Sequence, residues 1–179
     1  LPVITPSVVT VLLWRWLSLP TNGGFNAALE PIGLPTQSFL NDSQQALWCI
    51  VAMVVWANFG VGTVLYLAGI NEIPDSVIEA ATLDGANPLQ QFYGIILPLL
   101  RPIIFFNVVV SIIGTVQMFE QFYLMSGPGY STRTLALYTY ELGFQSVDLG
   151  YGAAVSMLMF IGLLFVTIIQ FWRFRSTAD

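Results

Sequence analysis

Three acidic side chains stand at helical spacing near the centre of the sequence. Glu72, Asp75 and Glu79 lie at positions i, i+3 and i+7, so one side of a helix would carry all three. Like charges at this spacing repel one another weakly. Such a stripe is typical either of a solvated face or of a surface that meets a basic partner, and the spacing leaves both interpretations open.

Polar side chains also interrupt an apolar run later in the chain, where they are costly and usually face a bundle interior or a cavity. They are Asn107, Ser111, Gln117, Glu120 and Gln121. On one continuous helix Asn107, Ser111, Gln117 and Gln121 share a broad face. A sugar needs such a face, because its hydroxyls require directional partners and its ring stacks on aromatic side chains such as Phe122. The alternative is hydrogen bonding between helices, which we weigh most for Asn58 and Asn107.

Several classes of site are absent from the sequence. The five basic residues are all arginine, and there is no histidine. Without lysine there is no GxxxxGK[ST] phosphate loop, and without histidine there is no Ser-His pair or HExxH zinc site. We therefore expect no catalytic, metal-binding or cofactor-binding residues in this chain. The arginines are scattered, which argues against a nucleic-acid surface.

The composition indicates a membrane protein. The chain is 56% hydrophobic and 8% charged, with a mean hydropathy of +0.76, whereas soluble domains carry about 25% charged residues. Four apolar runs cover residues 1–20, 46–70, 97–125 and 149–172. A helix of about 20 apolar residues crosses the hydrocarbon core, so each run predicts one crossing. The expected fold is an all-α, polytopic, integral-membrane bundle in a single domain, residues 1–179.

Arginine placement predicts the orientation of this bundle. Arg101, Arg173 and Arg175 fall on the side of the central segment, while Arg15 and Arg133 fall on the other. This bias favours a cytoplasmic central segment and a cytoplasmic C-terminus. Because the sequence begins without an initiator methionine, we also expect the domain to be N-terminally incomplete.

The central segment, residues 71–97, predicts a helix, a sharp turn and a second helix. Pro74 suits the first turn of a helix and Gly85 its end, while Asn87 and Pro88 suit the N-cap and first residue of the next helix. Helices this short are not stable alone in water, so both must rest on other structure.

The sequence EAATLDGANPLQQFYGIILP resembles the EAA loop of the permease subunits of binding-protein-dependent ABC importers. That loop has Glu-Ala-Ala, a glycine after three further residues, and Ile-x-Leu-Pro after another nine residues. Here Glu79-Ala80-Ala81, Gly85 and Ile95-Ile96-Leu97-Pro98 fit it. Flanking segments such as GPGYSTRTLALYTY and GYGAAVSMLMF resemble the carbohydrate branch. The resemblance covers essentially the whole chain and implies a MetI-like helical bundle.

The resemblance implies that residues 71–97 form a cytoplasmic coupling loop that seats in a cleft of a separate ATPase. The residues carried over are Glu79, Ala80, Ala81, Asp84, Gly85 and Ala86. Glu79 would meet a basic ATPase residue, and the alanines would permit close approach. Helix geometry puts Asp84 about 140° around from Glu79, so we expect Asp84 to bond the free amides around Asn87 and Pro88.

The implied function is that of a multi-pass permease subunit in a bacterial or archaeal cytoplasmic (inner) membrane, importing a sugar or related polyhydroxylated solute. The chain would not be an enzyme, and ATP-Mg would bind in a partner. The expected partners are a dimer of ATPase subunits, a second permease subunit, the lipid bilayer and an extracytoplasmic solute-binding protein that meets the outer loop at residues 127–133. The alternatives are an importer of glycerol phosphate or polyamine, and a membrane scaffold or channel without an ATPase.

Overall fold

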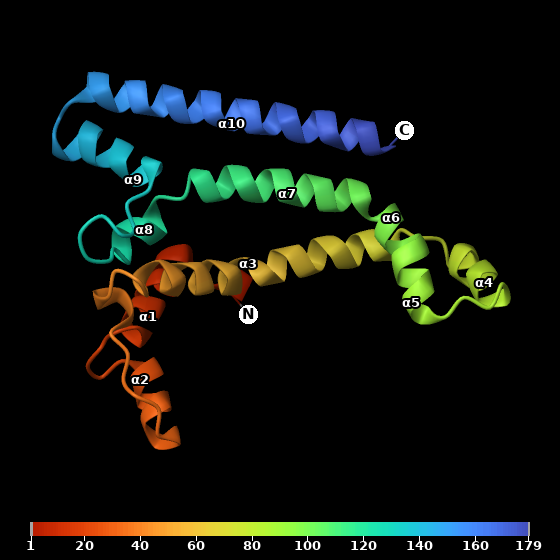
Figure 1. The fold of residues 1–179 in the computed structure, drawn as a ribbon, viewed down its shortest axis with the longest axis horizontal. Coiled ribbons are helices and arrows are strands. Elements are labelled where there is room, and N and C mark those ends of the chain that lie inside the picture. Colours follow the sequence, from red (N-terminus) through yellow and green to blue (C-terminus); the bar gives the residue numbers. More distant parts are fainter. Residues whose placement is uncertain (1, 179) are drawn as a thin grey trace.

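The computed structural model describes residues 2–178, and the side chains of residues 2–174. Within that part of the chain every regular element is a helix (Figure 1), which confirms the all-α fold. The elements are a 3-10 helix (Pro2–Ile4), α1 (Ser7–Leu17), α2 (Gly24–Leu29), two 3-10 helices (Glu30–Ile32 and Phe39–Asn41), α3 (Ala46–Asn71), α4 (Asp75–Leu83), α5 (Pro88–Gln91), a π-helical segment (Phe92–Ile96), α6 (Leu97–Leu99), α7 (Arg101–Val116), α8 (Glu120–Leu124), α9 (Leu135–Tyr140), a second π-helical segment (Glu141–Gln145) and α10 (Leu149–Ala178).

Two of the described helices are long and apolar enough to cross a membrane. They are α3, with 26 residues, and α10, whose qualifying stretch is Leu149–Phe174. A third candidate span is bent by 62° where Pro88–Leu99 meets Arg101–Val116. The first apolar run forms α1, whose 11 residues are fewer than a full crossing requires.

The expectation of one continuous helix over residues 97–125 is wrong at both ends. Pro102 cannot donate a hydrogen bond to the carbonyl of Pro98 and its ring crowds that carbonyl, so the helix bends at Leu100. At the other end α7 stops at Val116, and α8 begins only at Glu120. The intervening Phe119 turns its ring onto Tyr140, with a centroid distance of 4.6 Å.

The long helices α3, α7 and α10, which we call the shafts, run between two ends of the molecule. Figure 1 places these ends on opposite sides. We call them the α4 end, formed by α4 to α6, and the α8 end, formed by α1, α8 and α9. The chain reaches the α4 end along α3, returns along α7 and reaches it again along α10.

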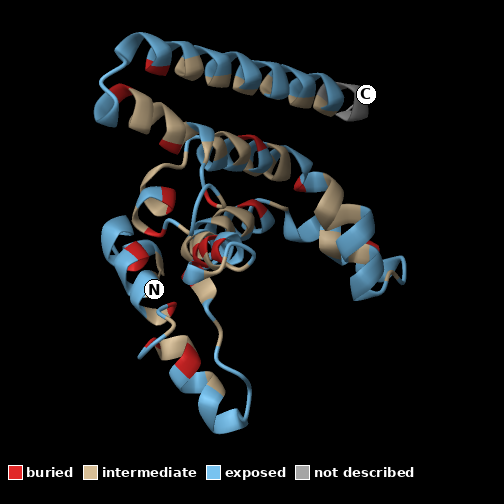
Figure 2. Cartoon of the chain, turned by 60° about the vertical axis from the view of Figure 1, so that its left-hand side comes forward, coloured by how far each residue is buried: buried red, intermediate tan, exposed pale blue. Residues whose placement is uncertain are grey.

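The buried core lies at the α8 end, where α1, α3, α8 and α9 meet (Figure 2). Its buried residues are Val11, Leu40, Ala46, Ile50, Met53, Phe122, Met125 and Leu137. By contrast, only 11% of the spanning window of α3, and the same share for α10, is buried. Most of both shafts therefore presents apolar side chains outward, as expected of helices that meet lipid or neighbouring helices.

A close contact joins α3 to α7 near the α4 end. Gly69 is buried there, and a Cβ at its position would contact Ile103 and lie 2.9 Å from Leu100 Cδ2. One turn further along, Asn107 Nδ2 donates a 2.8 Å hydrogen bond to the Tyr66 hydroxyl. Glycine at position 69 lets the two helix backbones approach each other closely.

Candidate functional site

The helix α4 lies beyond the bundle at the α4 end (Figure 1). Pro74 is its N-cap and Asp75 its first residue. The helix ends where Gly85 adopts a φ of +81°, with the Gly85 and Ala86 amides each donating 3.0 Å bonds to Thr82 and Ala81 carbonyls. A positive φ strongly favours glycine, so the predicted stop at Gly85 is confirmed.

A reciprocal cap starts the second helix, as the Asn87-Pro88 pair predicted. The Asn87 side chain accepts a 2.9 Å bond from the Gln90 amide, and the Gln90 side chain accepts a 2.8 Å bond from the Asn87 amide. The role expected for Asp84 is therefore wrong: Asp84 is exposed, and Gln90 accepts the bond from the Asn87 amide instead. The spacing of Asn87 and Gln90, three residues apart, was the overlooked sign of this capping box.

Gln91 links the two short helices, a role that no sequence pattern indicated. Its Nε2 donates bonds of 3.0 Å both to Thr82 Oγ1 on α4 and to the Ala86 carbonyl in the turn. The two helices of the segment are thus held together by side-chain and backbone bonds, although each is short.

The outer face of α4 combines two acidic residues with exposed apolar surface. A shallow groove of about 470 Å³ runs along it, lined by Asp75, Ile78, Glu79, Thr82 and Leu83. Leu83 at the tip is 89% exposed, a feature that the sequence pattern did not single out. Such a surface suits a basic side chain next to an apolar contact.

The residues expected to couple do not all lie on this face. Glu79, Ala80, Asp84 and Gly85 are exposed and Ala86 is half-buried. Ala81 is only 8% exposed, so it packs inward within the chain. The accessible part of the set is therefore centred on Glu79, Ala80 and the turn.

The expected polar face divides between two helices. Asn107 and Ser111 lie on α7, Gln117 is its C-cap, and Glu120 and Gln121 open α8. Because α7 ends at Val116, the single helical face predicted for Asn107, Ser111, Gln117 and Gln121 is wrong. Ser111 and Gln117 are exposed, whereas Phe122 is 7% exposed and belongs to the core.

The two asparagines considered for interhelical bonding behave differently. Asn107 bonds Tyr66 on α3, so the interhelical alternative is confirmed for it. Asn58 donates a 2.9 Å bond to the Val54 carbonyl four residues earlier in its own helix, so the expectation is wrong there.

Glu120 connects α8 to α1. Its Oε1 and Oε2 accept bonds of 3.1 and 3.0 Å from the Ser7 hydroxyl, and the residue is half-buried. The preceding residue, Phe119, begins a chain of aromatic rings with neighbouring centroids 4.6 to 5.4 Å apart. These rings belong to Phe119, Tyr123, Tyr140 and Phe144. A carboxylate beside aromatic faces can bind a polyhydroxylated ring through its hydroxyls and its C–H surface.

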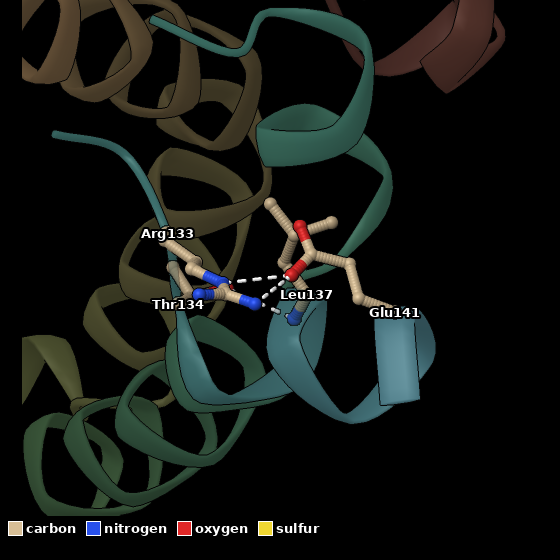
Figure 3. A network of polar contacts seen from close by, with 4 residues as sticks. All are labelled: Arg133, Thr134, Leu137 and Glu141. Atoms are coloured by element: carbon tan, nitrogen blue, oxygen red, sulfur yellow. Dashed lines mark hydrogen bonds and ion pairs between the residues drawn. The ribbon is translucent and has the colours of Figure 1, made fainter. Parts of the chain in front are cut away.

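The loop between α8 and α9 is anchored at both ends. At its start, the Gly127 amide donates a 2.9 Å bond to Thr132 Oγ1, and a Cβ on Gly127 would come within 2.5 Å of Ala46 Cβ. At its end, Arg133 Nε donates a 2.7 Å bond to Glu141 Oε2, as Figure 3 shows.

Arg133 is also held by aromatic rings. Its guanidinium carbon lies 4.9 Å from the Tyr130 ring centroid and 4.4 Å from that of Tyr138. Beside it, Thr134 Oγ1 accepts a 3.2 Å bond from the Leu137 amide and so caps α9 (Figure 3). The loop is an ordered surface that continues into α9.

A family model described as "binding-protein-dependent transport system inner membrane component" matches residues 1–177. The curated relatives include the probable ABC transporter permease protein YesP of Bacillus subtilis, 34% identical over 94% of this chain and 56% of the relative. The arabinooligosaccharides transport system permease protein AraP of the same organism is 31% identical over 95% of this chain and 56% of the relative. The sn-glycerol-3-phosphate transport system permease protein UgpA of Yersinia pseudotuberculosis is 32% identical over 96% of this chain and 59% of the relative.

Two solved structures share the arrangement of helices. A chain of a bacterial alginate ABC transporter, in complex with an alginate pentasaccharide-bound periplasmic protein, superposes with a TM-score of 0.88 at 25% identity, covering 95% of this chain and 60% of that one. A second structure, of a bacterial ABC transporter involved in alginate import, gives 0.89 at 23% identity over 99% and 63%. The chain thus spans 56–63% of these relatives and structures.

Proposed function

Because the chain belongs to the family of binding-protein-dependent transport system inner membrane components, we propose that it is a membrane-spanning subunit of an ATP-driven importer for a sugar or a related polyhydroxylated solute. It carries no GxxxxGK[ST] sequence, so ATP-Mg binds in a separate ATPase rather than here. The proposed location is the cytoplasmic (inner) membrane of a bacterium or archaeon, with several crossings and with the α4 end in the cytoplasm.

The observation that carries this proposal is the position of Glu79. It is exposed on a short helix that lies outside the bundle, beside a groove of about 470 Å³ with Leu83 at its tip. A hydrogen bond between a carboxylate and an arginine or lysine is stronger than a bond between neutral groups. An apolar neighbour such as Leu83 excludes water from that bond. The chain continues from α4 through α5 and α6 into α7, so a force applied at Glu79 reaches a candidate membrane span directly.

The proposal of a polyhydroxylated solute is supported by the side chains at the α8 end and by the names of the relatives. Glu120, Gln117 and Gln121 offer hydrogen-bonding groups, and they are near Phe119 and Tyr123 in the sequence, whose rings stack on each other. The names of AraP and of the alginate transporter refer to saccharides. A neutral or weakly charged polyhydroxylated solute matches this combination of hydroxyl partners and ring faces.

Import of glycerol phosphate is the second candidate, because UgpA is as similar to the chain as the sugar permeases are. A phosphate needs cationic partners. At the α8 end, however, the carboxylate of Glu120 would repel it, and Arg133 already pairs with Glu141. The charge of the transported solute therefore separates the two candidates.

The partners proposed for the chain are two ATPase subunits at the α4 end, a second permease subunit along the shafts, and a solute-binding protein at residues 127–133. The anchored loop supports the last of these, since an ordered surface loses less conformational entropy when it binds. The exposed apolar faces of α3 and α10 support the second.

Co-purification tests the proposal. The full-length protein is isolated from its native membrane in mild detergent as wild type, Glu79→Lys and Glu30→Lys. The last variant makes the same charge change at an exposed position outside α4. We expect an ATPase to accompany wild type and Glu30→Lys and to be depleted at least ten-fold with Glu79→Lys, together with loss of uptake. Absence of an ATPase from all three intact samples would instead support a scaffold or channel.

A further inference from the structure

A cavity of about 600 Å³ opens between the start of α7 and the last turns of α10. It lies at the α4 end, where Figure 1 shows the C-terminal part of α10 above α6. This volume is in the range of small-ligand sites, roughly 300–1,000 Å³. It shares no residue with the groove on α4 or with the polar groups of α8.

Aromatic side chains form the apolar wall of this cavity. Phe105 on α7 stacks on Phe174 of α10 with a centroid distance of 4.2 Å and an interplanar angle of 21°. Phe105 also meets Phe171 edge-on at 4.9 Å. Contacts to two rings of α10 fix the orientation of Phe105, so the wall is preformed.

The polar lining is basic. Arg101 and Arg173 both line the cavity and both are exposed, and no acidic residue is among the lining residues that the structure describes. The chain as a whole has ten acids and five arginines, so a cavity with two guanidinium groups runs against its overall charge. Gln170 adds an acceptor: its Oε1 is buried and has no hydrogen-bond partner among the described residues.

We propose that this cavity binds the headgroup of an anionic phospholipid. Guanidinium groups match phosphate oxygens in geometry and charge, and Gln170 Oε1 accepts a hydrogen bond from a headgroup hydroxyl such as those of phosphatidylglycerol. The lipid tails then lie along Phe105 and Phe174 and the apolar surface beyond them. Basic pockets between membrane helices take anionic lipids in this manner.

Position favours a lipid over a free anion. Arg101 begins α7 and Arg173 lies near the end of the spanning stretch of α10, so both arginines stand where apolar helix surface meets water. Trp172, 78% exposed, sits next to Arg173, as expected at a membrane interface. A phosphate held here is next to hydrocarbon and arrives attached to acyl chains. This proposal does not depend on the transport proposal.

Native mass spectrometry of the assembled, delipidated protein tests the site by titration with phosphatidylglycerol and with phosphatidylcholine. We expect one tightly held phosphatidylglycerol and no comparable phosphatidylcholine. Arg101→Gln and Arg173→Gln each weaken binding about five-fold, and the double variant about 25-fold, from about 1 kcal/mol for each basic side chain at an anionic surface. Arg15→Gln, which removes an exposed arginine at the α8 end, leaves binding unchanged.

Two further measurements test the role of Gln170 and distinguish a lipid headgroup from a free anion. Gln170→Leu weakens the binding of phosphatidylglycerol but not that of phosphatidic acid, which lacks the headgroup glycerol hydroxyls. If the arginine double variant is poorly folded, the double change to lysine, which keeps both charges, takes its place and retains the preference for anionic lipid. Equal retention of both lipids by wild type overturns the proposal. Displacement of the lipid by millimolar inorganic phosphate would assign the cavity to a free anion and would also overturn the lipid proposal.

Discussion

Asn107 and Tyr66 join the two helices that carry the candidate coupling segment. The hydrogen bond from Asn107 Nδ2 to the Tyr66 hydroxyl measures 2.8 Å and links residues 41 positions apart in the sequence. Asn107 is a candidate solute-path residue, and its side chain is already engaged in holding α7 on α3. Asn107 therefore has a structural role in joining α7 to α3, whereas Ser111 and Gln117 are exposed.

Tyr66→Phe should lower the thermal stability of the full-length protein in detergent. The change removes only the hydroxyl oxygen, and interhelical hydrogen bonds in membrane proteins are worth about 0.6 kcal/mol. Tyr151→Phe deletes the same atom from an exposed tyrosine and is the control. A melting temperature equally affected in both variants would show that the bond contributes nothing.

Gly69→Val should destabilise the protein by about 1–3 kcal/mol, because the added side chain overpacks the α3–α7 contact. A Cβ there already contacts Ile103 and lies 2.9 Å from Leu100 Cδ2. Gly114→Val is the matched control, since it makes the same change in a helix with no other heavy atom within 4 Å. Thermal unfolding of both variants checks this prediction, and equal shifts would contradict it.

Gly85→Ala should loosen the turn after α4. At a φ of +81°, a residue with a Cβ costs about 1–2 kcal/mol. We expect faster amide hydrogen exchange in residues 79–91, and weaker retention of the ATPase that the coupling proposal requires. Gly94→Ala has no neighbour within 4 Å and a negative φ, so it should leave exchange unchanged. Unaltered exchange in Gly85→Ala would mean that another contact holds the turn.

Arg133→Glu should release the loop at residues 126–134. The ion pair with Glu141 is partly exposed, with side chains at 30% and 27%, and such pairs are worth up to about 1 kcal/mol. The contacts with Tyr130 and Tyr138 add to this. Hydrogen exchange of the loop should rise.

The charge swap Arg133→Glu with Glu141→Arg separates the two contributions. It restores the ion pair but leaves no cation over the tyrosine rings at position 133, so protection should recover only in part. Full recovery would assign the anchoring to the ion pair alone, and no recovery would assign it to the rings.

Local chemistry made the central segment predictable. Gly85 and the Asn87-Pro88 pair determine backbone conformation within a few residues, so their spacing alone placed the turn and the second helix start. The two long shafts were likewise predictable from uninterrupted apolar sequence.

Tertiary packing made the α8 end unpredictable. Residues 112–125 are mostly apolar with no proline or terminal glycine signal at 117, yet the helix breaks there so that Phe119 reaches Tyr140 and Phe122 enters the core. Asn58 and Asn107 look alike in sequence, and only the position of Tyr66 on another helix distinguishes them. Contacts between distant residues decided both outcomes.

The bend at Leu100 joins a shorter helical arm in the central segment to a longer one, α7. Leu100 is 5% exposed and lies against Gly69, so it serves as a fulcrum on α3. On one side the arm Pro88–Leu99 is about 18 Å long, and on the other the 16-residue α7 is about 24 Å long. With both arms moving together about this fulcrum, the far end of α7 sweeps about a third further than the end of the short arm. In the proposed importer, a small displacement of the short arm would therefore become a larger one at the far end of α7.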